Sequence, residues 1–173
     1  MNYHNIKKCD MLNGEGIRVS LWVSGCEHNC NQCQNPQTWD INGGIPFEQE
    51  TEQELLLALK EEYISGITFT GGDPLHENNL EDVLNLVNKI RLLLPDKTIW
   101  IYSGYTWESI FSEEQDKLSQ IKRDIISQCN IFVDGKFIDE LKDITLKWKG
   151  SSNQRIIDVK QSLTKGEIVL YDI

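Results

Sequence analysis

Three cysteines within eight residues, Cys26, Cys30 and Cys33, constrain this chain more than any other feature of its sequence. A structural zinc site normally closes with four protein ligands, and a [4Fe–4S] cluster held by protein alone takes four cysteines. No fourth cysteine lies near this Cys-x3-Cys-x2-Cys loop, so a metal centre shared by the three thiolates keeps one coordination position open. The spacing therefore predicts an iron–sulfur cluster with one iron free to bind a substrate or cofactor.

A zinc knuckle is the alternative, with His28 or the distant Cys9 as the fourth ligand. His28 stands between two of the cysteines and would have to strain to reach the same metal. The total of five cysteines is odd, which in a reducing compartment points to metal ligation rather than to a disulfide framework. Cys9 and Cys129 lie far from the trio in sequence and are expected to be structural thiols. Cys129 ends an expected helix next to a strand, where a small buried thiol is common.

The composition is that of a folded protein, with 39% hydrophobic and 25% charged residues in a chain of 173. This length predicts a single domain spanning residues 1–173. A formal net charge of −10 argues against a nucleic-acid partner, because phosphate binding needs clustered cations. No apolar run approaches the ~20 residues of a membrane span, and the polar N-terminal residues do not resemble a signal peptide. We expect a cytoplasmic protein without a membrane partner.

Strand-like and helix-like hydrophobic patterns alternate along the chain about four times. Strands are expected over residues 18–23, 67–70, 98–102 and 130–133. Helices are expected from Thr51, where Thr51–Glu54 matches a capping box, over residues 80–94, after Thr106, and along the run with Leu118, Ile121 and Ile125. Strands joined by helical crossovers pair in parallel. The pattern predicts an α/β fold with a partial (β/α) barrel or a curled, open, mostly parallel sheet.

Each chemically suggestive loop follows one of the expected strands directly. These loops are the cysteine loop, Gly71–Pro74, Ser103–Tyr105 and Asp134–Lys136. Ligands of parallel α/β sheets bind at the carboxyl ends of the strands. We therefore expect the four loops to surround one cofactor.

The glycines at Gly71 and Gly72 allow a ligand to approach the backbone closely, so a side chain at position 72 is expected to occupy cofactor space. Asp134 and Lys136 can offer a carboxylate and an ammonium group on one side of the site. Arg18, near the start of the first expected strand, is expected to be exposed. The tail from about residue 137 is expected to cover the sheet or to contact a partner, with a final edge strand over residues 167–171.

Together these motifs resemble the activating proteins of anaerobic ribonucleoside-triphosphate reductase, a branch of the radical S-adenosylmethionine (radical SAM) superfamily. The resemblance covers about residues 1–157 and is carried by Asp10 with Gly14, Gly16 and Arg18, Gly25–Cys33, Gly71–His76, Ser103–Tyr105, Asp134–Phe137 and Gly150–Gln154. It implies a [4Fe–4S] cluster on Cys26, Cys30 and Cys33. It also implies contacts to S-adenosylmethionine from Gln32, Cys33, Gln34, Gly71, Gly72, Asp73, Asp134 and Lys136. Many members of the superfamily have an aromatic residue where this chain has Gln32.

The resemblance further implies a radical SAM oxidoreductase that cleaves S-adenosylmethionine reductively to a 5′-deoxyadenosyl radical. That radical would generate a glycyl radical on the large subunit of the anaerobic (class III) ribonucleotide reductase. The electron would come from a low-potential donor such as a flavodoxin. Two alternatives stay open: an activase of another glycyl-radical enzyme, such as pyruvate formate-lyase, and a non-catalytic iron–sulfur or zinc module with a complete ligand set.

Overall fold

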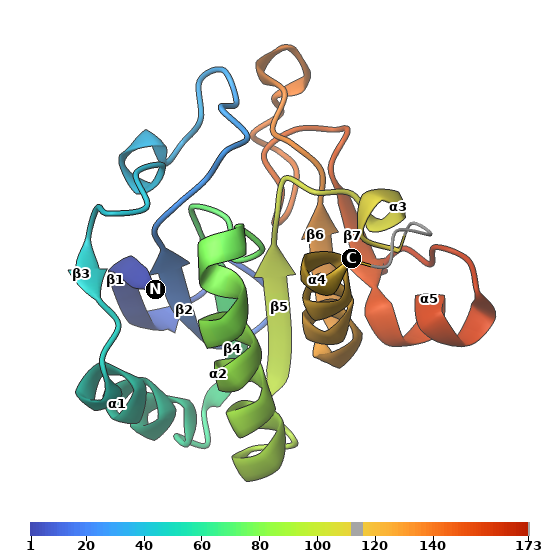
Figure 1. Ribbon diagram of the computed structural model, residues 1–173. Helices are drawn as coiled ribbons and strands as arrows, with labels where there is room; N and C mark the ends of the chain where they lie inside the picture. The colour runs from blue at the N-terminus through green and yellow to red at the C-terminus, as the bar shows by residue number, and fades with distance from the viewer. Residues whose placement is uncertain (112–115, 173) are drawn as a thin grey trace.

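A computed structural model describes residues 1–111 and 116–172, and Figure 1 shows the chain arranged around one sheet. In the described residues the sheet has seven strands in the order β3-β1-β2-β4-β5-β6-β7. The strands are β1 (Asn2–Asp10), β2 (Ile17–Val23), β3 (Ile45–Pro46), β4 (Ile64–Gly71), β5 (Thr98–Tyr102), β6 (Ile131–Asp134) and β7 (Arg155–Asp158). The α-helices are α1 (Gln49–Leu59), α2 (Leu80–Leu93), α3 (Trp107–Ile110), α4 (Lys117–Gln128) and α5 (Val159–Lys165).

The centre of the sheet is parallel, as the alternating pattern predicts. Strands β2, β4, β5 and β6 pair in parallel, whereas β1 and β3 on one side and β7 on the other add antiparallel strands. Because β3 and β7 are the two edges, the sheet is open and not a closed barrel. The carboxyl ends of the four parallel strands share one edge, which lies at the top of Figure 1.

Helices α1, α2 and α4 cover one face of this sheet, the face toward the viewer in Figure 1. Alternate strand residues point to this face and are apolar and fully buried, because period-two alternation sends them all toward the helices. The buried cluster includes Val19, Leu21, Ile67, Phe69, Ile99, Ile101 and Phe132 from the strands, and Leu55, Val83, Val87, Ile90 and Ile125 from the helices. This packing fixes where the strands end, and therefore where their loops lie.

The opposite face of the sheet carries polar and aromatic residues. Its uppermost row, nearest the carboxyl edge, is made by Trp22, Thr70, Tyr102 and Val133, since Trp22 lies opposite Thr70 and Tyr102 lies opposite Val133. A second cluster of Trp100, Ile131, Val133 and Ile156 packs on this face against Trp148 and Tyr171 of the tail. Trp148 and Tyr171 of the tail therefore lie against this face of the sheet.

Arg18 lies on the same face, and the expectation that it is exposed was wrong: its exposed fraction is 1%. Its guanidinium group donates to oxygen atoms of Glu15, Thr68, Thr98 and the Ile67 backbone, at 2.7–3.1 Å. Burying a charged group is costly unless its donors are satisfied, and here the sheet itself satisfies them.

Two expectations about element ends were also wrong. Helix α1 begins at Gln49 after Glu48, so the Thr51–Glu54 sequence lies inside the helix and does not cap it. Residues 167–171 contribute only the single bridge between Ile157 and Leu170 rather than an edge strand.

No helix within residues 1–111 and 116–172 combines the length and the apolar character that a bilayer crossing requires.

Candidate iron–sulfur site

The cysteine loop leaves the carboxyl end of β2 and is anchored by backbone hydrogen bonds. Gly25 N–H donates to Thr38 O at 2.8 Å, and Cys26 N–H donates to Trp39 O at 3.1 Å. The loop contains left-handed residues, Asn29 at φ 49° and Gln32 at φ 54°, and asparagine tolerates this conformation better than most residues. A short loop with fixed ends therefore carries all three cysteines of the trio.

The three thiols of the loop are half-buried and influence one another electrostatically. Burial raises the pKa of Cys26 to about 11, and burial also raises the pKa of Cys30. The backbone N–H of Phe137, in the loop after β6, opposes this effect on Cys30 by a hydrogen bond to the thiol. The backbone N–H of Asn35 donates to Cys33 Sγ at 3.4 Å. Such N–H groups also favour bound thiolates, so the surroundings of the trio suit a metal–sulfur centre.

The candidate fourth ligands of a zinc knuckle lie elsewhere. In the described part of the chain, no three His, Cys, Asp or Glu side chains, the three cysteines included, are placed to hold a single metal ion. His28 Nε2 is engaged with Asp73 Oδ2, and Cys9 is exposed on β1, outside the loop. Cys129 is buried and donates to the Ile125 carbonyl at 3.3 Å. Neither His28 nor the two distant cysteines completes a four-ligand set around the trio.

Asp73 joins three of the four loops at the carboxyl edge of the sheet. Its exposed fraction is 1%, and its Oδ1 accepts from Leu75 N–H at 2.8 Å. Its Oδ2 accepts from Ser103 Oγ at 2.8 Å and Gly104 N–H at 3.1 Å, and lies 2.5 Å from His28 Nε2. The carboxylate thus links the glycine turn to the cysteine loop and to the loop after β5.

Both glycines of the turn are required by nearby protein atoms. A Cβ at Gly72 would lie 2.5 Å from Gly25 O and 2.9 Å from Thr38 O, which are backbone atoms beside the cysteine loop. Gly71 has φ 106°, a left-handed conformation that favours glycine. The turn therefore packs directly against the cysteine loop, whatever else approaches it.

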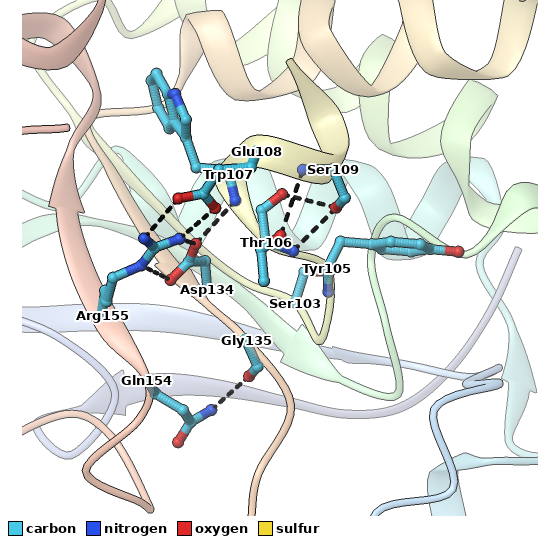
Figure 2. Close-up of polar contacts among 10 residues, drawn as sticks. All are labelled: Ser103, Tyr105, Thr106, Trp107, Glu108, Ser109, Asp134, Gly135, Gln154 and Arg155. Carbon is cyan, nitrogen blue, oxygen red and sulfur yellow. Dashed lines mark hydrogen bonds and ion pairs between the residues drawn. The ribbon is translucent and has the colours of Figure 1, made fainter. Parts of the chain in front are cut away.

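The loop after β6 is held by the ion-pair network of Figure 2. Arg155 of β7 pairs with both oxygens of Asp134 and, at 2.8 and 2.7 Å, with both oxygens of Glu108. Asp134 Oδ2 also accepts from the backbone N–H of Trp107 at 2.8 Å, at the start of α3. These contacts hold the pKa of Glu108 down, at about 2, because Arg155 donates to its carboxylate.

Gln154 explains part of the Gly150–Gln154 motif. Its Nε2 donates to Gly135 O at 3.0 Å, and its Oε1 accepts from Gly150 N–H at 2.9 Å (Figure 2 shows the first bond). The side chain therefore holds the tail against the loop after β6. Lys136, the next residue in that loop, has an exposed side chain that is close enough to lower the pKa of Cys30.

A cavity of about 450 Å³ opens between the cysteine loop, the sheet and the tail. Its lining includes Cys33 and Gln34 on one side, Trp22, Thr70 and Tyr102 on the sheet, and Phe137, Trp148 and Gly150 of the tail. Of the residues that the sequence predicts around the cofactor, Cys33 and Gln34 line this cavity. Gln32, Gly71, Gly72, Asp73, Asp134 and Lys136 are not among its lining residues.

Sequence reasoning missed His28 as the partner of Asp73, and it missed the pairing of Arg155 with Glu108 and Asp134. The signal for His28 was its position inside the cysteine loop, beside the glycine turn on the same sheet edge. No sequence pattern connects Arg155 to Asp134, because they meet only when β7 pairs with β6.

Comparison with known proteins agrees with this arrangement. Residues 12–157 match the family model of a 4Fe-4S single cluster domain. The chain is 42% identical over 156 residues to the anaerobic ribonucleoside-triphosphate reductase-activating protein of Escherichia coli K12, covering 89% of this chain and 96% of that protein. The proteins of the same name from Vibrio cholerae and from Enterobacteria phage T4 are 41% and 40% identical, over 90% of this chain and 97% and 93% of theirs.

The fold and the cysteine loop thus define a 4Fe–4S single-cluster protein. More particularly, the chain belongs to the family of anaerobic ribonucleoside-triphosphate reductase-activating proteins.

Proposed function

We propose that this chain is a radical SAM oxidoreductase that activates the anaerobic (class III) ribonucleotide reductase by forming a glycyl radical on its large subunit. The names of its relatives support the target. The observation that carries the proposal is the position of the three cysteines: they lie at the carboxyl edge of the parallel strands, beside a cavity that Cys33 itself lines. A cluster held by these three thiolates would keep one coordination position for a cofactor.

In this proposal Cys26, Cys30 and Cys33 hold the [4Fe–4S] cluster, and S-adenosylmethionine binds in the adjoining cavity. When bound, the cluster and S-adenosylmethionine supply the reductive cleavage that yields a 5′-deoxyadenosyl radical, with the electron coming from a low-potential donor such as a flavodoxin. The protein binds and orients these groups and excludes competing reactions.

The roles of the chain's own residues follow from their positions. Cys33 and Gln34 line the cavity and are proposed to contact the cofactor. Asp73, with Gly71 and Gly72, is proposed to fix the position of the cysteine loop relative to the cofactor. Gln32 and Lys136 have exposed side chains, for which a contact to the cofactor's charged end is proposed. Asp134 is proposed to position the loop that carries Lys136.

The target glycine must be brought to the site, because a primary carbon radical is too reactive to diffuse away. The cavity is about 450 Å³, at the small end of the usual range for ligand sites, so it leaves little room for a second large ligand. This size favours a flexible glycine-bearing segment of another protein as the target, entering at the open edge of the sheet.

The test mixes the reconstituted protein with the reductase, a reductant and S-adenosylmethionine under strict anaerobiosis. Methionine, 5′-deoxyadenosine and a glycyl radical doublet in the electron paramagnetic resonance spectrum are the expected products. The Cys30→Ala variant is the negative control, and pyruvate formate-lyase replaces the reductase in a parallel reaction. Cleavage without a doublet on the reductase would reject the assigned target. A doublet on pyruvate formate-lyase alone would identify the chain as an activase of that enzyme.

A further inference from the structure

The Gly150–Gln154 motif of the tail binds the loop after β6, residues 135–138, on both sides of Phe137. Three side chains of the motif each bind one backbone group of this loop: Gln154 Nε2 donates to Gly135 O at 3.0 Å, Asn153 Nδ2 donates to Lys136 O at 2.8 Å, and Ser151 Oγ accepts from Ile138 N–H at 3.2 Å. Figure 2 shows the bond from Gln154. These bonds restrict the loop before and after Phe137.

The motif is itself folded by internal bonds, so it can hold the loop in one position. Gln154 Oε1 accepts from Gly150 N–H at 2.9 Å and from Ser151 N–H at 3.2 Å, and Ser151 is fully buried. A Cβ at Gly150 would lie 3.0 Å from the Phe137 ring. The missing side chain at Gly150 therefore lets the ring pack against the motif.

The N–H of Phe137 is directed at the cysteine loop. It donates to the thiol of Cys30, whereas the groups that flank it in sequence are bound by the motif. Phe137 and Cys33 line the same cavity, and a Cβ at Gly150 would lie 3.5 Å from Gln34 Nε2. The motif, the loop after β6 and the cysteine loop thus pack together.

An N–H group on a ligand sulfur affects the two redox states of an iron–sulfur cluster differently. An added electron makes the cluster and its sulfur atoms more negative, so a donor on the sulfur stabilises the reduced state more than the oxidised state. Hydrogen bonds to the sulfurs are accordingly among the factors that set the reduction potential of such clusters.

We propose that the Gly150–Gln154 motif positions the Phe137 N–H on the sulfur of Cys30, and that this hydrogen bond raises the reduction potential of the cluster. The inference rests on the proposed function, since it takes Cys30 as a cluster ligand. Ser151, Asn153 and Gln154 are positioning residues in this arrangement. A higher potential makes it easier for the external donor to deliver its electron.

The direct test replaces Phe137 by phenyllactic acid, its α-hydroxy analogue. The resulting ester keeps the ring and the net charge and removes the N–H donor. The control is the same replacement at Phe47, whose N–H donates to a backbone oxygen, Met1 O, at 3.0 Å instead of to a thiol. A mediated redox titration of the cluster-loaded proteins without S-adenosylmethionine, followed by electron paramagnetic resonance, gives the midpoint potential, and iron and sulfide are counted for each protein.

A second pair of variants tests the positioning by the motif. Asn153→Ala removes the donor to Lys136 O. Ser152→Ala is the matched control, because Ser152 is exposed within the same motif. Neither substitution changes the net charge, so a shift in potential cannot come from a gained or lost charge.

A hydrogen bond to a charged acceptor is worth about a factor of ten in an equilibrium constant. At a fixed potential, the ratio of reduced to oxidised cluster should therefore fall up to about tenfold in the Phe137 ester, which is about 59 mV for a one-electron couple. Asn153→Ala should lower the potential by less, because two side chains still hold the loop. The Phe47 ester and Ser152→Ala should keep the wild-type potential. A purely structural role would reduce the iron content without shifting the potential of the remaining cluster.

The failures are distinguishable. If the wild type forms the cluster and the Phe137 ester has an unchanged or higher potential, the inference is overturned and the proposed function stands. If the ester lowers the potential and Asn153→Ala does not, the positioning by the motif is overturned. If the ester protein holds no cluster, Asn153→Ala against Ser152→Ala decides by the same criterion. If the wild type forms no [4Fe–4S] cluster, the proposed function fails and takes this inference with it.

Discussion

His28 Nε2 lies 2.5 Å from Asp73 Oδ2, and this contact ties the cysteine loop to the glycine turn 45 residues further along the chain. His28 also packs edge-on against Tyr105, with ring centroids 4.8 Å apart. His28, the alternative zinc ligand in the cysteine loop, therefore has a different structural role. It fixes the loop that carries the three cysteines to the loops after β4 and β5.

The first prediction concerns Asp73. Replacement by Ala leaves the N–H groups of Leu75 and Gly104 and the hydroxyl of Ser103 without their acceptor. Unsatisfied buried donors cost about 1–3 kcal/mol each, so we expect Asp73→Ala to unfold at clearly lower denaturant and to retain less iron. Asp96→Ala, at an exposed carboxylate, is the control. Wild-type iron content and stability in Asp73→Ala would show that the carboxylate does not organise these loops.

The second prediction separates the cluster ligands from the other thiols. Replacing Cys26, Cys30 or Cys33 by Ala should abolish cluster binding, because two thiolates cannot retain the cluster. Cys129→Ala and Cys9→Ala should retain it, since one thiol is buried beside Ile125 and the other is exposed on β1. Iron and acid-labile sulfide per chain are the measurements. Loss of iron in either of the last two variants would mean that the ligands are misassigned.

The central sheet was predictable from the sequence because its four parallel strands carry apolar residues, in alternation or in short runs, that must be buried. Strand β1 was missed, because its exposed residues, such as Lys7 and Lys8, give no apolar alternation. Arg18 was misjudged because its burial depends on acceptors from neighbouring strands, Thr68 and Thr98. The sequence pattern of one strand does not reveal which hydrogen-bond acceptors the neighbouring strands provide.

The candidate site was predictable in outline for a different reason. Loops that follow parallel strands share one edge, so the cysteines and the glycine turn had to meet. Which side chains pair within that edge depends on three-dimensional packing. Asp134 is an example. The sequence predicts a contact with the cofactor, and the structure adds that its carboxylate accepts from Arg155 and from the N–H of Trp107.

The third prediction revises the expectation for Gly72. A Cβ at this position meets backbone oxygens of Gly25 and Thr38 within 3 Å, so Gly72→Ala should displace the cysteine loop. We expect reduced iron retention as well as weaker binding of S-adenosylmethionine, whereas a glycine that only clears cofactor space would leave the iron content normal. Gly166→Ala is the control, since its Cβ meets no atom within 4 Å and only its φ of 70° is unfavourable. Full iron content in Gly72→Ala would favour the simpler cofactor-space explanation.

The last prediction uses the pH dependence of the pair between Glu108 and Arg155. Arg155 lowers the pKa of Glu108 to about 2 from the ordinary 4.5, so the carboxylate is more acidic in the folded chain than in the unfolded one. The unfolded chain therefore takes up the proton first as the pH falls. The pair stabilises the fold fully above pH 4.5, and this contribution is lost progressively between pH 4.5 and pH 2.

Glu108→Gln should accordingly lower the free energy of unfolding at pH 7 by about 0.5–1 kcal/mol, the modest value of a largely exposed ion pair. The difference from the wild type should shrink steadily below pH 4.5 and vanish only below pH 2, because about half of the folded wild-type carboxyl is still ionised at pH 2. Urea unfolding of the iron-free proteins across this range measures it, and Glu62→Gln, at an exposed position before β4, controls for the loss of one negative charge. A difference that stays constant, or that grows toward acid, would contradict the assignment of this stabilisation to the ionised pair. Once protonated, Glu108 no longer attracts Arg155 through its charge. The direction in which the stability difference changes with pH therefore shows whether the ionised pair stabilises the fold.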